Sequence, residues 1–166
     1  MRITDILVLL ASAAAAYTDV TSRRIPNALP IALGIAGLAS TLVADPRAVL
    51  AFAAILVAAL AFGTMLHARG LLGGGDVKLI AAAAATYGLR DAPTFLAATL
   101  LAGGTLALAV AAIRGRLRAT VANLTAFAVP MLAGVRPNAI VNGTKMPYAL
   151  AIFAGALALA LVHAMH

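Results

Sequence analysis

Long apolar runs dominate this chain and limit what it can fold into. Hydrophobic residues fill 64% of its 166 positions and charged residues only 10%, whereas a soluble domain has about 45–50% and about 25%. The runs are rich in Ala and Leu and approach the length of about 20 residues that a membrane-spanning helix needs. Strands of an outer-membrane barrel would instead alternate in polarity over about ten residues. The sequence therefore predicts an all-α integral membrane protein, a single-domain bundle of about six transmembrane helices.

Polar and proline-containing segments divide the chain into the expected spans. The spans are expected at residues 3–18, 28–43, 49–66, 76–88, 94–113 and 147–162. A polar turn is expected at 17–27 and tight turns at Asp45–Arg47 and Arg90–Pro93, with Asp45 and Asp91 as turn residues. Asp5 is expected to be an interfacial cap. The first run could also be a signal peptide, but positive charges follow it, which favours a retained span.

The positive charge of the chain predicts its orientation. Twelve Lys and Arg face five Asp, giving a net charge of +7. In a membrane protein this charge sets topology and contacts anionic lipid headgroups, and no aromatic and basic patch typical of nucleic-acid binding accompanies it. Eight cations are expected on one side, namely Arg23, Arg24, Arg69, Arg114, Arg116, Arg118, Arg136 and Lys145. Three are expected on the other, namely Arg2, Arg47 and Arg90. The first side is therefore predicted to be cytoplasmic, and the weakly apolar residues 119–145 an interfacial segment.

Two of the few acids are expected to form a catalytic site. Asp76 directly follows three glycines at the head of an apolar run, and Asp19 ends the first span on the same predicted side. A carboxylate at the centre of a membrane helix costs about 2.5–3.5 kcal/mol, less near the interface, so the two should share a polar cavity. Such a pair shares one proton, and can activate water while polarising a peptide carbonyl. The pair predicts peptide hydrolysis without a metal.

Other interpretations of these residues stay open. Asp76 alone could be a helix cap. Acids inside a membrane also mark ion paths, so a small proton-coupled carrier or channel is an alternative, as is a non-catalytic assembly subunit. The absence of Cys excludes thiolate nucleophiles and Cys-type zinc sites. His67, His163 and His166 have no ligand-like spacing, so neither a metal nor another cofactor is expected.

Three motifs resemble those of the type IV prepilin peptidases, intramembrane aspartic proteases of the GxGD type. Residues 73–79 fit GGGDxKL, Asp19 with residues 23–27 fits the pattern D…R.IPN, and residues 146–149 are similar to the PY or PF start of the family's last helix. The resemblance implies that Asp19 and Asp76 are the catalytic pair. It also implies cleavage of prepilin and pseudopilin leaders after a glycine, at the cytoplasmic face of a prokaryotic inner membrane.

The substrate contacts and the subtype are less well defined. The residues expected to contact the precursor are Gly73, Gly74, Gly75, Lys78 and Tyr148. The glycines should let a substrate backbone approach and tolerate unusual backbone conformations, whereas Lys78 points to another helix face than Asp76 and is not expected to be catalytic. Larger family members carry a Cys-type zinc domain and methylate the new N-terminus. Without Cys, this chain is similar to the short, peptidase-only form of Flp-type (tight adherence) pili, and methylation is not expected.

Overall fold

The computed structural model describes residues 1–115, 118, 122 and 148–165, and the regular structure of this part is entirely helical. The elements are α1 (Ile3–Ser22), α2 (Ala28–Ala44), a 3₁₀ helix η1 (Pro46–Ala48), α3 (Val49–Ala68), α4 (Gly74–Ile113) and α6 (Ala149–Met165). Within the described part, α1, the stretch Pro46–Ala68 and α4 are long and apolar enough to cross a membrane, while α2 and α6 are shorter apolar helices. The all-helical membrane class is confirmed, and the number of six crossings stays a prediction. The expected interfacial segment at 119–145 lies outside the described residues apart from Ala122.

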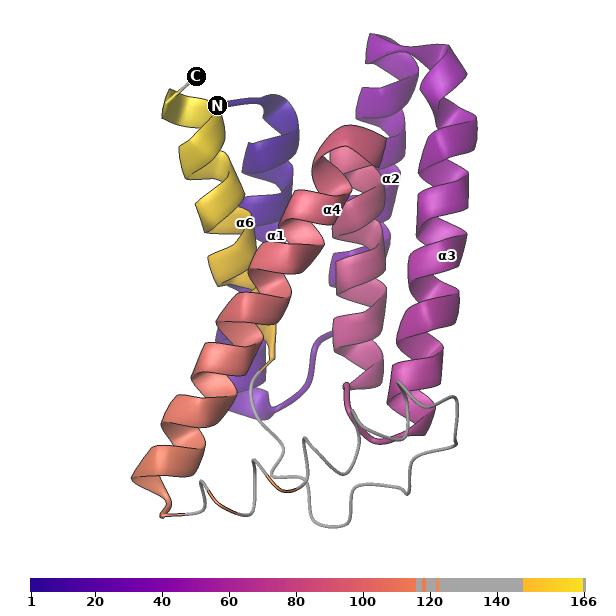
Figure 1. Ribbon diagram of the computed structural model, residues 1–166. Coiled ribbons are helices and arrows are strands. Elements are labelled where there is room, and N and C mark those ends of the chain that lie inside the picture. The colour runs from indigo at the N-terminus through magenta and orange to yellow at the C-terminus, as the bar shows by residue number, and fades with distance from the viewer. Residues whose placement is uncertain (116–117, 119–121, 123–147, 166) are drawn as a thin grey trace.

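α4 consists of two helical halves that meet at a kink. Its 40 residues would extend about 60 Å, twice the hydrocarbon thickness of about 30 Å. The helix breaks at Gly88, where φ is 73° and ψ is 178°, and its two halves run in opposite directions (Figure 1). The turn predicted at Arg90–Pro93 is therefore wrong, because these residues are helical. Gly88 makes the change of direction alone, since it has no Cβ, and Pro93 lies inside the helix that follows.

α1 is longer than predicted, because it continues to Ser22. The hydroxyls of Thr18, Thr21 and Ser22 donate hydrogen bonds to carbonyls of their own helix, so these residues do not form the predicted polar turn. The helix ends at Arg23, which has φ 51° and donates its N–H to the carbonyl of Asp19 at 2.9 Å. Residues 23–27 alone connect α1 to α2, and Asp19 lies in the last helical turn.

Small residues let the helices of the bundle pack closely around α4. This helix packs against α2, α3 and α6, while α1 packs against α2 and α6. Residues 81–85, all Ala, are almost fully buried. Gly37 faces Thr86 and Gly155 faces Thr99 so closely that an added Cβ would overlap the neighbouring side chain. Close backbone approach of this kind is the usual way in which helices associate in lipid.

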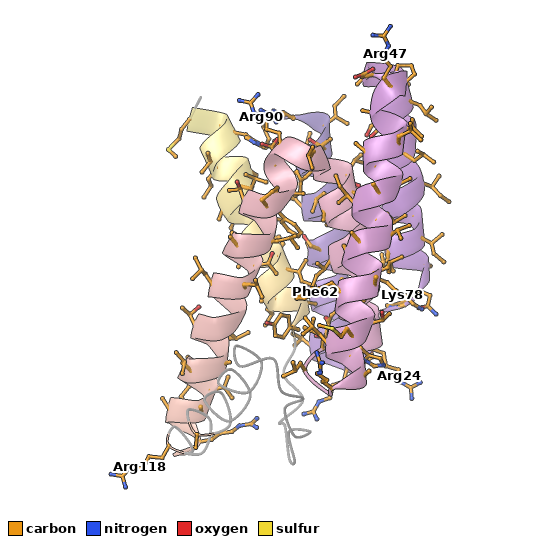
Figure 2. The ribbon with its side chains drawn as sticks, turned by 45° about the vertical axis from the view of Figure 1, so that its right-hand side comes forward. Arg24, Arg47, Phe62, Lys78, Arg90 and Arg118 are labelled. Atoms are coloured by element: carbon orange, nitrogen blue, oxygen red, sulfur yellow. The ribbon has the colours of Figure 1, made fainter. Side chains whose placement is uncertain are left out.

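The ends of the helices form two groups. Both termini, the connection from α2 to α3 and the bend of α4 lie at one end of the bundle, here called the terminal end (Figure 1). The end of α1 and the starts of α4 and α6 lie at the other, here called the site end. Arg47 and Arg90 lie at the terminal end, and Arg24 and Arg118 at the site end (Figure 2). This grouping agrees with the predicted sidedness, and the assignment of the site end to the cytoplasm stays a prediction.

Candidate active site

Three helix ends meet at the site end and bring the two predicted acids together. Asp19 lies in the last turn of α1, Asp76 lies in the first turn of α4, and α6 begins at Ala149. Asp19 Oδ2 accepts a hydrogen bond at 3.5 Å from the backbone N–H of Ala149. The carboxylates of Asp19 and Asp76 are close enough for their charges to interact. Acids far apart in sequence, on separate helices, therefore share one site.

Asp76 is held by the start of its own helix. Gly73 is the N-cap of α4, and its backbone lies beside the Asp76 carboxylate. The carboxylate lies so close that a Cβ on Gly73 would be 2.6 Å from Oδ2. Asp76 is nevertheless only 8% exposed, and within the described part of the chain its buried Oδ1 has no hydrogen-bond partner. A buried, unpaired oxygen is costly for a residue that only caps a helix.

Asp19 faces the N-terminus of α6. The first N–H groups of a helix have no partner within it, and their partial positive charge favours a nearby anion. At 3.5 Å the hydrogen bond from Ala149 is long and therefore weak. Asp19 is partly buried, so it is neither sequestered in the core nor fully solvated. Asp19 is less buried than Asp76, so the two carboxyl groups have different surroundings.

Tyr148 completes the site from the start of α6. A Cβ on Gly103, in the second half of α4, would lie 2.6 Å from the Tyr148 hydroxyl, so this glycine makes room for the ring. The side chain also lies within range of the charge on Asp76. Tyr148 and Ala149, the described part of the third sequence motif, therefore lie near Asp76 and Asp19 respectively.

Two of the three glycines before Asp76, Gly73 and Gly75, are closely packed. None of them has a positive φ, since the positive values among described glycines belong to Gly70, Gly88 and Gly115. The expectation of unusual backbone conformations at 73–75 is therefore wrong. A Cβ on Gly75 would lie 2.9 Å from the Cβ of Ile25, whereas one on Gly74 would meet nothing nearer than His67, at 3.6 Å. Their predicted contact with a precursor stays a prediction.

Lys78 is exposed and reaches the loop that connects α1 to α2. Its Nζ donates a hydrogen bond to Oδ1 of Asn27 at 2.9 Å. The contact joins the GGGDxKL motif to the IPN motif. Neither motif by itself gives any signal of this contact, because it depends on how α2 and α4 are placed.

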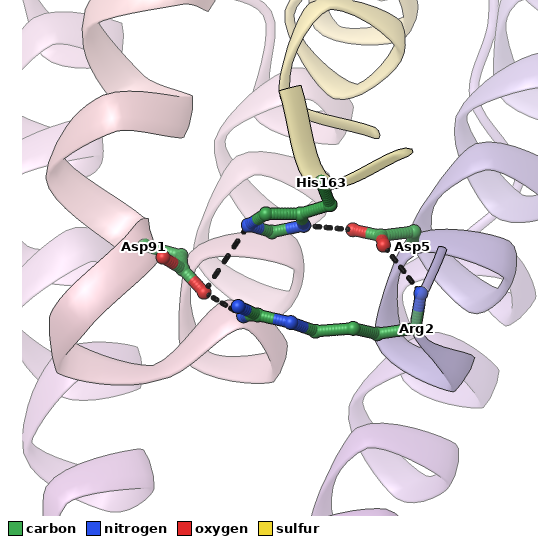
Figure 3. A network of polar contacts seen from close by, with 4 residues as sticks. All are labelled: Arg2, Asp5, Asp91 and His163. Carbon is green, nitrogen blue, oxygen red and sulfur yellow. Dashed lines mark hydrogen bonds and ion pairs between the residues drawn. The ribbon is translucent and has the colours of Figure 1, made fainter. Parts of the chain in front are cut away.

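A second polar cluster lies at the terminal end, and the sequence did not predict it. His163 Nδ1 is 2.9 Å from Oδ1 of Asp5, and its Nε2 is 3.6 Å from Oδ2 of Asp91 (Figure 3). Asp5 also accepts a hydrogen bond at 2.7 Å from the backbone N–H of Arg2, whose guanidinium pairs with Asp91. Asp5 is thus a cap, as predicted, but it is fully buried. The assignment of Asp91 to a turn is wrong, because it joins α4 to α1 and α6.

The chemistry of the site end follows from two unlike carboxyl groups. Within the described residues, no group of three or more His, Cys, Asp or Glu is placed to hold a metal ion. Asp19 and Asp76 lie within range of each other's charge. Such a pair supplies a base and an acid side by side.

The comparison with known families fits this site. The sequence pattern of the type IV leader peptidase family matches residues 6–108. No curated protein and no solved structure matches the chain. The matched region contains most of α1, all of α2 and α3, and most of α4, including both acids, whereas α6 lies beyond it. The chain belongs to the type IV leader peptidase family, and it is a protease of that kind with the apolar helices of a membrane protein.

Proposed function

We propose that this protein is an intramembrane aspartic endopeptidase that removes the leader from type IV prepilins and pseudopilins of the Flp type. The observation that carries the proposal is the placement of both acids at the site end, with Asp19 in the last turn of α1 and Asp76 in the first turn of α4, within range of each other's charge. The other three acids have partners of their own. Asp5 and Asp91 belong to the cluster with His163, and Asp45 accepts a hydrogen bond from the backbone N–H of Arg47. Asp19 and Asp76 are the two acids placed at the site end.

The proposed reaction needs only water and the two carboxyl groups. The ionised partner takes a proton from water, whose oxygen attacks the scissile carbonyl carbon. The protonated partner donates a hydrogen bond to the carbonyl oxygen and stabilises its developing charge. When the C–N bond breaks, one of the two carboxyl groups gives a proton to the leaving amine. The products are a leader with a new carboxylate and a mature chain with a free amine. The proton that the pair holds is shared by the two carboxyl groups.

The site end would also bind the precursor. Gly73 is exposed beside Asp76, so an extended backbone can pass over it without meeting a side chain. Tyr148, which lies within range of the charge on Asp76, would contact the same backbone. The predicted sidedness places this reaction at the cytoplasmic face of a prokaryotic inner membrane, and the absence of Cys is the reason to propose cleavage without methylation.

Product analysis tests this function. The purified protein in lipid vesicles is incubated with an Flp-type precursor, and both fragments are identified by mass spectrometry. The proposal expects one cut, a leader that ends in glycine, and an unmodified N-terminus on the mature chain. An intact precursor under conditions where the protein is folded would contradict the peptidase proposal, and a methylated product would contradict the proposed subtype.

A further inference from the structure

Lys78 has a partner but no part in the chemistry proposed above. It follows Asp76 by two positions, which on an α-helix is a rotation of about 200°, so the two side chains point to different faces. Its exposed side chain lies at the site end (Figure 2) and donates from Nζ to Oδ1 of Asn27 at 2.9 Å. Asn27 is the N-cap of α2. The bond therefore connects the first turns of α4 to the end of the loop that follows Asp19.

A second contact fixes the same loop on the same helix start. The side chain of Ile25 lies against Gly75, where a Cβ would be 2.9 Å from the Cβ of Ile25. Real Cβ atoms do not approach a branched carbon so closely without a shift, so only glycine allows this contact. The loop is thus fixed on α4 by an apolar contact at residue 25 and by a hydrogen bond at residue 27.

The loop is short, so its attachment controls the position of Asp19. Residues 23–27 alone separate α1 from α2. At the start of the loop, the N–H of Arg23 donates to the carbonyl of Asp19 at 2.9 Å. On the other side, Asp76 lies between the two attachment points, Gly75 and Lys78. Each acid is therefore within a few residues of the place where the loop and α4 meet.

We propose that Lys78 and Asn27 are a positioning pair, which holds the loop on the head of α4 and so sets the spacing of Asp19 and Asp76. This inference rests on the proposed function, because it gives Lys78 a role in the alignment of the same two acids. It is an alternative to the precursor contact predicted for Lys78. A positioning pair affects the rate of the chemical step, whereas a contact with the precursor affects binding.

Kinetics of four variants test the positioning role. Lys78→Met and Asn27→Leu should each lower kcat about tenfold, as expected for loss of a hydrogen bond to a charged group, with KM within about twofold. The double variant should have a kcat no lower than that of either single variant, because both substitutions remove the same contact. The exchange of the two residues, Asn27→Lys with Lys78→Asn, should recover part of the rate. Arg24→Gln is the control, since it removes a positive charge from the same loop and should leave both constants unchanged.

A measurement without substrate separates this inference from the proposed function. Because the chain has no Cys, spin labels attach only to cysteines that are introduced. We choose Ser22→Cys and Ala68→Cys, at the exposed ends of α1 and α3. The distance distribution between them should broaden in Lys78→Met and stay narrow in Arg24→Gln. An unchanged distribution would overturn the inference even if cleavage failed for other reasons. A rise in KM alone, or a broadened distribution with normal kcat, would overturn it as well.

Discussion

Replacing His163 with Leu should destabilise the bundle, because it leaves the carboxylate of Asp5 buried without its side-chain partner. Asp5 is fully buried and the His163 side chain is 9% exposed. Removal of one member of a buried, hydrogen-bonded pair costs about 3 kcal/mol or more. Asp5 keeps the N–H of Arg2, so we expect a loss of about 3 kcal/mol, at the lower end of that range.

The neighbouring pair of Arg2 and Asp91 provides the matched control. The Arg2 side chain is 51% exposed, and exposed ion pairs contribute about 0–1 kcal/mol. Arg2→Gln removes this pair but keeps the backbone N–H that Asp5 accepts. The two substitutions therefore act on one cluster and should differ by about 2 kcal/mol or more in the free energy of unfolding.

Thermal unfolding in detergent micelles, followed by far-ultraviolet circular dichroism, measures this difference. His163→Leu should lower the apparent midpoint by about 5–10 °C, and Arg2→Gln by no more than about 3 °C. A double variant, Asp5→Asn with His163→Gln, should recover part of the loss, because two amides can pair without a buried charge. Equal midpoints for His163→Leu and Arg2→Gln would refute the reasoning.

Two further substitutions test the packing of the site end. Gly75→Ala should lower both stability and cleavage, because its Cβ would press on Ile25, whereas Gly74→Ala meets only His67, at 3.6 Å, and should unfold at the normal temperature. Unfolding curves that do not distinguish these two variants would show that the loop contact is unimportant. Tyr148→Phe keeps the ring against Gly103 but removes the hydroxyl near Asp76. It should lower cleavage about tenfold with little change in unfolding temperature, and normal cleavage would exclude a role for the hydroxyl.

The meeting of Asp19 and Asp76 was predictable because it depends on helix count and direction alone. Apolar runs of membrane length must alternate in direction, so the end of the first run and the start of the fourth fall on the same side. A few residues of error in a helix end do not change this. α1 continues four residues beyond the predicted end at Thr18, and Asp19 still reaches the site end.

The details that the sequence did not predict depend on single residues or on contacts between distant segments. The bend of α4 is at Gly88 and not at the proline and charged residues that follow, because one glycine with a positive φ reverses the chain. The cluster around His163 joins α1, α4 and α6, and no spacing along the chain reveals such a contact. The same is true of Lys78 and Asn27, which lie on neighbouring helices and meet through side chains alone.

Separate replacement of the two acids tests the central claim most directly. Asp19→Asn and Asp76→Asn keep the size of the side chain but remove the acid, and Asp45→Asn is the control at the terminal end. Cleavage of a prepilin by each purified variant is measured with and without a chelator. The account predicts a loss of at least about a thousandfold in rate for either site variant, normal cleavage by the control, and no effect of the chelator. A normal rate in either Asp19→Asn or Asp76→Asn would contradict the two-acid mechanism.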